Sequence, residues 1–317
     1  AELEKRIETK LTQEMVAVES INLGKASRMN DAQGRYIEFC KSSFTDLDLN
    51  GLSILLDCAN GATYSVAPKV FSELGAKVET IGSSPDGINI NQNCGSTNPD
   101  FLKEEIIKGS YDLGIAFDGD GDRILIVNSE GDILDGDDIL YILSNNLTAA
   151  SGVVGTLMTN KALEIYFEKN DIPFLRADVG DKYVLQRLLE ESWVLGGEPS
   201  GHIICLDSAP TGDAIIAALN LLDAIKDNNF SVKKSLEGFK KFPQTLINLK
   251  VNNPNKIIVS DKFWSEVTRI EKQLGQNGRV LIRPSGTEPL IRIMVESDKS
   301  GASHDFCNAL ADLAQTI

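Results

Sequence analysis

The stretch DLGIAFDGDGDRILIVN, residues 112–128, decides the fold of this chain. Two short aliphatic runs, 112–117 and 123–128, flank a loop in which three aspartates alternate with two glycines. Runs of this length predict buried strands, and glycine lets the backbone curl tightly between them. We therefore expect the loop to follow a strand directly and to bring three carboxylates close together.

The segments on either side of this loop alternate between strand and helix patterns. We expect the first region to contain strands over 53–58 and 77–82 and helices over 32–43, 66–74 and 99–108. The pattern then restarts, with helices over 137–147, 162–169, 179–189 and 213–225 and strands over 153–158, 172–177, 193–197 and 202–206. This alternation is typical of parallel βαβ layers, so two consecutive α/β units are predicted.

The two ends of the chain follow other patterns. Apolar residues spaced by three and four predict a helix over 1–19. The tail predicts strands over 245–250, 279–282 and 289–296 and helices over 262–274 and 304–314. The fold class is therefore α/β, with two consecutive α/β domains of mixed or parallel sheets followed by a small α+β C-terminal domain. We place the boundaries near 28, 135 and 243, which gives the segments 1–28, 29–135, 136–243 and 244–317.

The composition excludes several classes of protein. The 317 residues include 46 acidic and 31 basic side chains, a net charge of −15, which disfavours non-specific binding to nucleic acid. The longest apolar stretch, 214–222, is too short for a membrane span. Residues 1–20 are charged throughout and do not resemble a signal peptide. Five scattered cysteines without a C-x-x-C pair indicate reduced thiols and a cytoplasmic protein.

Asp118, Asp120 and Asp122 form a candidate metal site in the central loop. Three carboxylates this close repel one another unless a cation lies among them. Their hard oxygens suit Mg²⁺ or Ca²⁺, and the lack of a nearby His or Cys in the sequence disfavours zinc and copper. An EF-hand is excluded because its sixth and twelfth positions would be Arg123 and Ser129. A surface turn rich in Asp and Gly and a D-x-D phosphatase site remain as alternatives.

A second loop, RPSGTEP at 283–289, is a candidate phosphate site. Hydroxyls, backbone amides and forked guanidinium donors together suit a phosphate dianion. From Gln244 onward the chain carries nine basic and eight acidic side chains, so this near-neutral tail tolerates an anion. The alternative is an ordinary polar turn. The candidate residues are Arg283, Ser285, Gly286, Thr287 and Arg292.

A third loop, GGEPSGH at 196–202, contains one of the two histidines. Glu198, Ser200 and His202 alternate, so an extended segment would present them on one face. A carboxylate and a hydroxyl there could hold sugar hydroxyls or an amine, with His202 carrying a proton near neutral pH. The alternative is a Gly-Pro turn with a hydrogen-bonded histidine.

Taken together and in this order, the three loops resemble a known set. The motifs DGDGDR (118–123), GEPSGH (197–202) and RPSGTEP (283–289) resemble the metal, sugar and phosphate loops of the α-D-phosphohexomutase superfamily. Longer stretches are similar to the bacterial phosphoglucosamine mutase family, among them LGKASRMNDAQGRYIEFCK (23–41), LLDCANGATY (55–64), VGTLM (154–158) and VGDKYV (179–184). The resemblance spans essentially the whole chain.

That resemblance implies an isomerase which interconverts glucosamine 6-phosphate and glucosamine 1-phosphate, on the route to UDP-N-acetylglucosamine and the cell wall. A phosphoserine would donate its phosphoryl group to the sugar, and the bisphosphate intermediate would return the other phosphate. Arg123 would lie near the transferring phosphate, and His202 would be an acid or base. The implied cofactor is Mg²⁺, held by Asp118, Asp120, Asp122 and the phosphoserine.

The resemblance also assigns the binding residues. Sugar contacts would fall to Gly180, Asp181, Glu198 and Ser200. The phosphate that is not reacting would be held by Arg283, Ser285, Gly286, Thr287 and Arg292.

The chain departs from the family at its front. The family's serine loop, typically S-A-S-H-N-P, occurs nowhere in the 317 residues, and 1–28 resemble the last helix and exit strand of the first of four domains. We therefore expect this chain alone to bind Mg²⁺ weakly and to lack mutase activity. The alternatives are a mutase of glucose or mannose phosphates and a non-catalytic phosphosugar-binding module.

The resemblance finally implies the partners of the chain. A phosphorylated amino sugar would be its substrate, and a glucose-type bisphosphate its activator. Homo-oligomers would form through the missing domain. Neither nucleic acid nor a membrane is expected as a partner.

Overall fold

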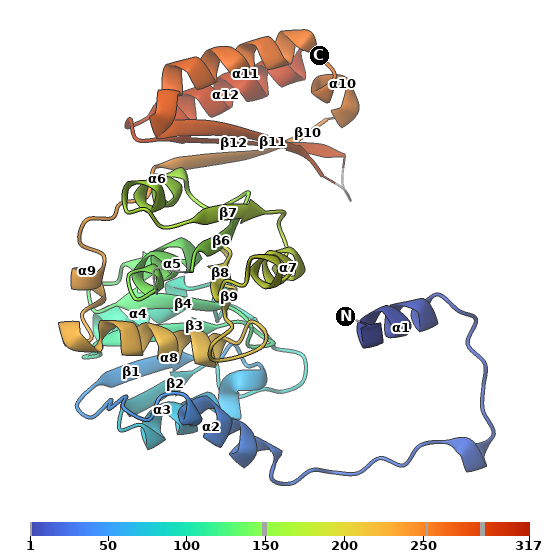
Figure 1. Ribbon diagram of the computed structural model, residues 1–317, viewed down its shortest axis with the longest axis vertical. Coiled ribbons are helices and arrows are strands. Elements are labelled where there is room, and N and C mark those ends of the chain that lie inside the picture. Colours follow the sequence, from blue (N-terminus) through green and yellow to red (C-terminus); the bar gives the residue numbers. More distant parts are fainter. Residues whose placement is uncertain (1, 148–150, 252, 286–288) are drawn as a thin grey trace. The chain divides into compact units, whose positions relative to one another are not determined.

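The computed structural model describes residues 2–147, 151–251, 253–285 and 289–317 (Figure 1). The chain divides into two units, Ala1–Tyr36 and Ile37–Ile317, which we describe separately. None of the helices in the described residues is both long enough and apolar enough to cross a membrane.

The first unit is mostly irregular. Helix α1 covers Glu2–Leu11, and one 3₁₀ turn covers Ser20–Asn22. The helix predicted over 1–19 is therefore wrong beyond Leu11, and no strand forms among residues 12–28, all of which are described. Met15 and Val18 are 94% and 57% exposed. Burial of these side chains does not offset the entropy cost of ordering the chain, and a short helix without a packed apolar face is marginal in water.

The first sheet has the strand order β2-β1-β3-β4-β5. Strands β1, β2 and β3 are parallel, whereas β4 and β5 run antiparallel to their neighbours. The short loop between β3 and β4 permits only an antiparallel pair, because a parallel crossover needs about a dozen residues or more. The strands are Ser53–Asp57, Lys77–Ile81, Leu113–Phe117, Ile124–Asn128 and Ile133–Leu134, in the order β1 to β5.

Three helices belong to this region. Helix α2 (Ala32–Ser42) crosses the division between the two units, and α3 (Ala67–Glu73) follows a 3₁₀ turn at Ala62–Ser65 and packs on β2. Helix α4 (Asp100–Lys108) packs on β1, β3 and β4, where its Leu102 and Ile106 enter the core. The β3–β4 hairpin, which carries the aspartate loop, thus packs on a buried apolar layer.

The second sheet has the order β7-β6-β8-β9, with β9 antiparallel to β8. Helix α8 is apolar on nearly all sides and packs against both β4 and β9, so it joins the first two sheets. The strands β6 to β9 are Val153–Thr156, Phe174–Ala177, Leu195–Gly197 and Ile203–Cys205. The helices α5 to α9 are Gly136–Ser144, Lys161–Lys169, Asp181–Glu191, Ala214–Ile225 and Val232–Ser235, with a 3₁₀ turn at Lys226–Asn228.

The third sheet is antiparallel, with the order β10-β12-β11. Helices α11 and α12 cover one of its faces (Figure 1). The strands β10 to β12 are Gln244–Lys250, Gly278–Pro284 and Leu290–Ser297. The helices α10 to α12 are Pro254–Ile258, Asp261–Leu274 and Ala302–Gln315, with a 3₁₀ turn at Gly275–Asn277. The predicted fold class, two α/β regions followed by a small α+β region, is confirmed.

Candidate functional site

The aspartate loop is the turn of the β3–β4 hairpin. Each of Asp118, Asp120 and Asp122 offers one carboxylate oxygen, and these three oxygens lie within 4.8 Å of one another. Asp118 is buried, Asp122 is half-buried and Asp120 is exposed. The loop therefore opens on one side, at Asp120, and closes on the other.

Backbone amides shape this loop around one oxygen of Asp118. Its Oδ1 accepts hydrogen bonds from the backbone N–H groups of Gly121, Asp122 and Arg123, at 3.2, 3.1 and 3.0 Å. Gly121 has φ +80°, which an L side chain rarely adopts. The sequence of alternating Asp and Gly thus folds into a cradle that leaves the other oxygen of Asp118, Oδ2, free of these amides.

The electrostatics of the loop favour a cation. Burial raises the pKa of the Asp118 carboxyl, and the side chain of Asp122 raises it further although the Arg123 backbone amide lowers it. Asp122 Oδ1 is buried and accepts no hydrogen bond from any described residue. A hard divalent cation would neutralise the repulsion between the carboxylates, and it would coordinate the Asp122 oxygen that accepts no hydrogen bond. The donor set therefore fits Mg²⁺.

Arg123 follows the loop and keeps most of its donors available. Its Nε lies 3.9 Å from Asp118 Oδ2 and 3.8 Å from Asp122 Oδ1, longer than a hydrogen bond. The side chain is 45% exposed. The guanidinium can thus turn toward an anion without first breaking a tight ion pair.

The second candidate loop is the turn between β8 and β9. Glu198 O accepts from the backbone N–H of Gly201 at 3.0 Å and closes the turn. Glu198 Oε1 accepts from the backbone N–H of Gly180 at 2.8 Å, and Ser200 donates from Oγ to Glu198 Oε2 at 3.3 Å. The structure therefore gathers Glu198, Ser200 and Gly180, and Asp181 begins helix α7 directly after Gly180.

The aspartate loop and this turn lie side by side. Ile124 N–H donates to Gly201 O at 3.0 Å, and Arg123 and His202 form an isolated β-bridge. Gly201 has φ +92°, and a Cβ there would lie 2.0 Å from Ile124 O. Only glycine allows this close approach, which brings the carboxylate cluster next to the Glu198–Ser200 pair.

His202 is buried and contacts the aspartate loop. The residue is 4% exposed, and its Nδ1 lies 3.1 Å from Asp122 Oδ2. Its Nε2 is buried and has no hydrogen-bond partner within the described part of the chain. The backbone N–H of Glu198 donates to His202 O at 2.9 Å, so the two residues are neighbours across the turn. Whether Glu198, Ser200 and His202 share one face stays a prediction.

The third candidate loop lies on the C-terminal sheet. Arg283 on β11 and Arg292 on β12 are direct register partners, and Ser285 N–H donates to Leu290 O at 2.9 Å. Gly286 and Thr287 lie outside the described residues. The hydrogen bonds and ion pairs of the other two loops, as far as residues are described, include neither arginine.

Sequence reasoning did not identify Gly212, which packs against the His202 ring. A Cβ at Gly212 would lie 2.2 Å from His202 Nε2. Nothing in the local sequence signals this contact, since it arises only when the segment leading into α8 meets the turn between β8 and β9.

Three family models match consecutive parts of this chain. They describe the phosphoglucomutase/phosphomannomutase alpha/beta/alpha domain II at residues 34–131, domain III at 135–242, and the C-terminal domain at 246–313.

Similar whole proteins carry related names. A phosphoglucosamine mutase of Pseudomonas aeruginosa is 48% identical over 321 residues, which cover 100% of this chain and 72% of that protein. The Aspergillus fumigatus N-acetylphosphoglucosamine mutase, solved with GlcNAc-6P and magnesium, has a TM-score of 0.72 at 19% identity over 88% of this chain and 70% of that one. A variant of the same enzyme, solved with glucose 1,6-bisphosphate, has a TM-score of 0.69 at 19% identity, covering 90% and 65%.

Proposed function

Because the chain belongs to the phosphoglucomutase/phosphomannomutase family and, within it, to the phosphoglucosamine mutases, we propose that it carries the metal, sugar and phosphate sites for interconverting glucosamine 6-phosphate and glucosamine 1-phosphate. The observation that supports this most directly is the backbone contact between Ile124 and Gly201. It holds a cluster of three carboxylates beside the Glu198–Ser200 pair, so a cation and a sugar would be neighbours.

The aspartate loop would hold Mg²⁺. Asp118 and Asp122 each have one carboxylate oxygen in hydrogen bonds with the protein and a second oxygen without one. Each residue could therefore coordinate the cation through that second oxygen. Asp120 adds a third carboxylate from the exposed side. The cation would neutralise charge on the phosphoryl group during its transfer.

The remaining residues would bind and orient the substrate. Arg123 would donate to the transferring phosphate, because its guanidinium is not committed to a tight pair. Glu198 is held by Gly180 and Ser200 and still has lone pairs for the sugar's hydroxyls or ammonium. Catalysis of this kind works by positioning and by stabilising charge in the transition state.

Arg283 and Arg292 would hold the phosphate that does not react. Like charges opposite each other on one sheet face are unfavourable unless an anion lies between them. We also propose Ser285, Gly286 and Thr287 for this phosphate, and Asp181 for the sugar. The domain boundaries near 28, 135 and 243, a cytoplasmic location, activation by a glucose-type bisphosphate and homo-oligomers remain proposals.

Isothermal titration of the chain with phosphosugars in Mg²⁺ tests the substrate class. We expect glucosamine 6-phosphate to bind more tightly than glucose 6-phosphate and mannose 6-phosphate. In Glu198→Gln this preference should shrink, since the variant loses the charge that faces the amino group. Equal affinities for all three sugars in the unsubstituted chain, or a preference for mannose, would contradict the proposed substrate.

The same samples test for turnover. Since the serine-loop string is absent from the 317 residues, we expect binding without conversion. Formation of glucosamine 1-phosphate by this chain alone would show that expectation to be wrong. Release of free phosphate would instead indicate a D-x-D phosphatase.

A further inference from the structure

Two residues of β10 share a sheet face with the arginines proposed for the phosphate. Arg292 on β12 is the register partner of Arg283 on β11 and of Asn248 on β10. Residues directly opposite each other in antiparallel strands point to the same face of the sheet. Lys250 lies two positions after Asn248 on β10, so its side chain points to that face as well.

This face, which we call the uncovered face, is the one that α11 and α12 do not cover. The alternate residues of the strands, among them Ile291 and Ile293, form the apolar core with those two helices. At one end of the uncovered face Arg279 and Glu296 form an ion pair. Arg283 lies four positions after Arg279 on β11, about 13 Å along the strand, so the proposed phosphate site is at the other end.

Positive charge gathers at that other end. Lys250 and Arg292 are exposed, and Arg283 is half-buried. No ion pair among the described residues includes any of these three, and the carboxylate on the uncovered face, Glu296, is bonded to Arg279. Neighbouring cations repel one another, so the arrangement is unfavourable unless an anion lies among them. The charge pattern therefore indicates a ligand.

Asn248 adds hydrogen-bond donors to this end of the uncovered face. Its side chain is exposed, and its Cβ lies roughly 5 Å from that of Arg292, as in any directly opposed pair. The amide offers two N–H groups, and it makes no hydrogen bond to a side chain or backbone group of the described residues. A phosphate between the two arginines would therefore have a neutral donor beside it as well as the guanidinium groups.

We propose that Asn248 and Lys250 are further binding residues of the phosphate site. The Asn248 amide donates to a phosphate oxygen that Arg292 also contacts, and Lys250 adds positive charge at the exposed edge. This deepens the proposed function and rests on it for the location of the site. The ligand is a phosphate dianion, either free or as a sugar monoester, and the assignment does not depend on which sugar carries it.

Titration calorimetry with inorganic phosphate and with glucosamine 6-phosphate tests the role of Lys250. Lys250→Met keeps an apolar stem of similar length but removes the charge, and we expect the Kd for both ligands to rise about 3- to 10-fold. The difference should shrink between about 0.01 M and about 1 M salt, because an exposed charge is screened. Lys250→Arg should retain most of the affinity. Lys262→Met is the matched control, since Lys262 is exposed on α11 at the covered face, and it should leave both Kd values unchanged.

Two substitutions at Asn248 separate a direct contact from a general effect of charge. Asn248→Ala removes the donor without adding charge, so we expect about 2- to 10-fold weaker binding of both ligands. Asn248→Asp places a carboxylate of the same shape opposite Arg292 and should weaken binding by at least about 10-fold, because the new carboxylate repels phosphate and pairs with the arginine. This cross-strand pair is favourable, so the variant should not unfold more easily. Asn255→Asp on exposed α10 adds the same charge away from the strands and is the control.

The results distinguish this proposal from the proposed function. Affinities for both ligands that are unchanged in Lys250→Met and Asn248→Ala, with folding verified by circular dichroism, would overturn the β10 contacts and leave the proposed function in place. If both variants weaken inorganic phosphate as expected but glucosamine 6-phosphate binds no better than mannose 6-phosphate, the β10 contacts stand and the proposed substrate fails. Absence of binding of either ligand to the unsubstituted chain would refute both.

Discussion

Arg283 and Arg292 are the pair of side chains that we propose for the phosphate that does not react. They face each other across β11 and β12 in antiparallel register, and Arg292 is exposed. Two cations in this relation repel each other, which is a small cost to stability. An arrangement that is unfavourable for folding and suited to a phosphate dianion is typical of a binding site.

Arg292→Gln should separate these two effects. We expect affinity for glucosamine 6-phosphate to fall roughly 10- to 100-fold, because a charge-assisted hydrogen bond contributes about 1.5–3 kcal/mol. The midpoint of thermal unfolding should stay the same or rise slightly, since the repulsion with Arg283 is removed. Titration calorimetry and a melting curve measure the two quantities.

The control for this substitution is Arg269→Gln on α11, which removes an exposed arginine that pairs with Glu266. It should leave the affinity unchanged and the melting midpoint nearly so, because exposed ion pairs contribute little to stability. Unchanged sugar-phosphate affinity in Arg292→Gln would remove this residue from the proposed phosphate site.

At the residue scale the sequence could indicate which chemistry is present but not every contact. Alternating Asp and Gly after an aliphatic run predicted a carboxylate cluster, because the pattern and the turn it forms are both local. The bond between Asp122 and His202 could not be predicted, since it forms only when α8 and the β8–β9 turn pack beside the first sheet.

Three aspartates at the N-terminus of helix α5 have different interactions. Asp135 and Asp138 form a capping box, and Lys241 pairs with both at 2.7 and 2.6 Å. Asp137 is buried, accepts from the Asn160 backbone N–H through Oδ2, and has no partner at Oδ1 among the described residues. Burial, followed by repulsion from Asp135, raises the pKa of Asp137 to about 8.

This raised pKa makes stability depend on pH in a definite direction. An aspartate ionises near pH 4 in the unfolded chain but near pH 8 in this fold, so between these values the folded state holds the extra proton. The contribution of the Asp137 carboxyl to the free energy of unfolding is fully present below about pH 4 and is lost as pH rises through about 8. Asp137→Asn removes the ionisation. Its stability relative to the unsubstituted chain should therefore increase by roughly 1–3 kcal/mol between pH 5.5 and pH 8.5.

Urea unfolding at the two pH values measures this difference. Asp312→Asn, at an exposed position on α12, is the control and should show a difference that does not vary with pH. A pH-independent difference for Asp137→Asn as well would mean that Asp137 ionises normally in the fold.

At the element scale, prediction succeeded where a segment's own pattern matched its burial. The strands β1, β3 and β4 appear within a residue of their predicted bounds, because continuous aliphatic runs suit a sheet covered on both faces. The two-residue β5 and the five-residue α10 are too short to show a period. The helix predicted over 1–19 failed beyond Leu11 because its spacing was correct but its apolar side chains are not buried.

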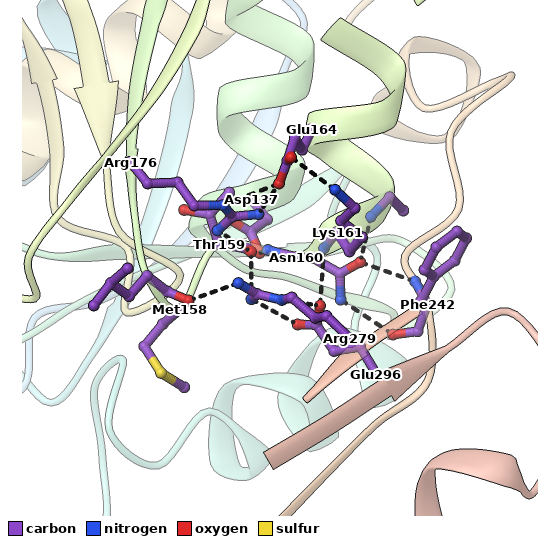
Figure 2. A network of polar contacts seen from close by, with 12 residues as sticks. Asp137, Met158, Thr159, Asn160, Lys161, Glu164, Arg176, Phe242, Arg279 and Glu296 are labelled. Atoms are coloured by element: carbon purple, nitrogen blue, oxygen red, sulfur yellow. Dashed lines mark hydrogen bonds and ion pairs between the residues drawn. The ribbon is translucent and has the colours of Figure 1, made fainter. Parts of the chain in front are cut away.

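A buried polar network connects the C-terminal sheet with the second sheet (Figure 2). Arg279 on β11 donates from Nε to Glu296 Oε2 at 2.7 Å, and its Nη1 and Nη2 donate to Leu157 O and Thr159 O at 2.9 and 2.8 Å. Glu296 on β12 is fully buried and also accepts from the Lys161 backbone N–H at 3.0 Å. The Arg279–Glu296 ion pair is thus hydrogen-bonded to the loop that leads into α6.

Substitutions in this pair should loosen the contact between the two regions. Removing one partner leaves a buried charge uncompensated, so Arg279→Met and Glu296→Leu should each cost about 3–5 kcal/mol of unfolding free energy. The double variant should cost less than the sum of the two, because it leaves no unpaired charge. Three backbone groups, Leu157 O, Thr159 O and Lys161 N–H, still lose partners, so its recovery should be incomplete.

Hydrogen exchange at the Lys161 amide reports on this contact directly, beside urea unfolding. In Glu296→Leu this amide loses its acceptor and should exchange faster, whereas the amides inside β1 and β3, in the first sheet, should keep their protection. The exposed pair of Arg269 and Glu266 is the control, since its removal should change the unfolding free energy only slightly. If each single substitution at Arg279 and Glu296 cost as little as this surface pair, the network would not be what holds the C-terminal sheet to the loop before α6.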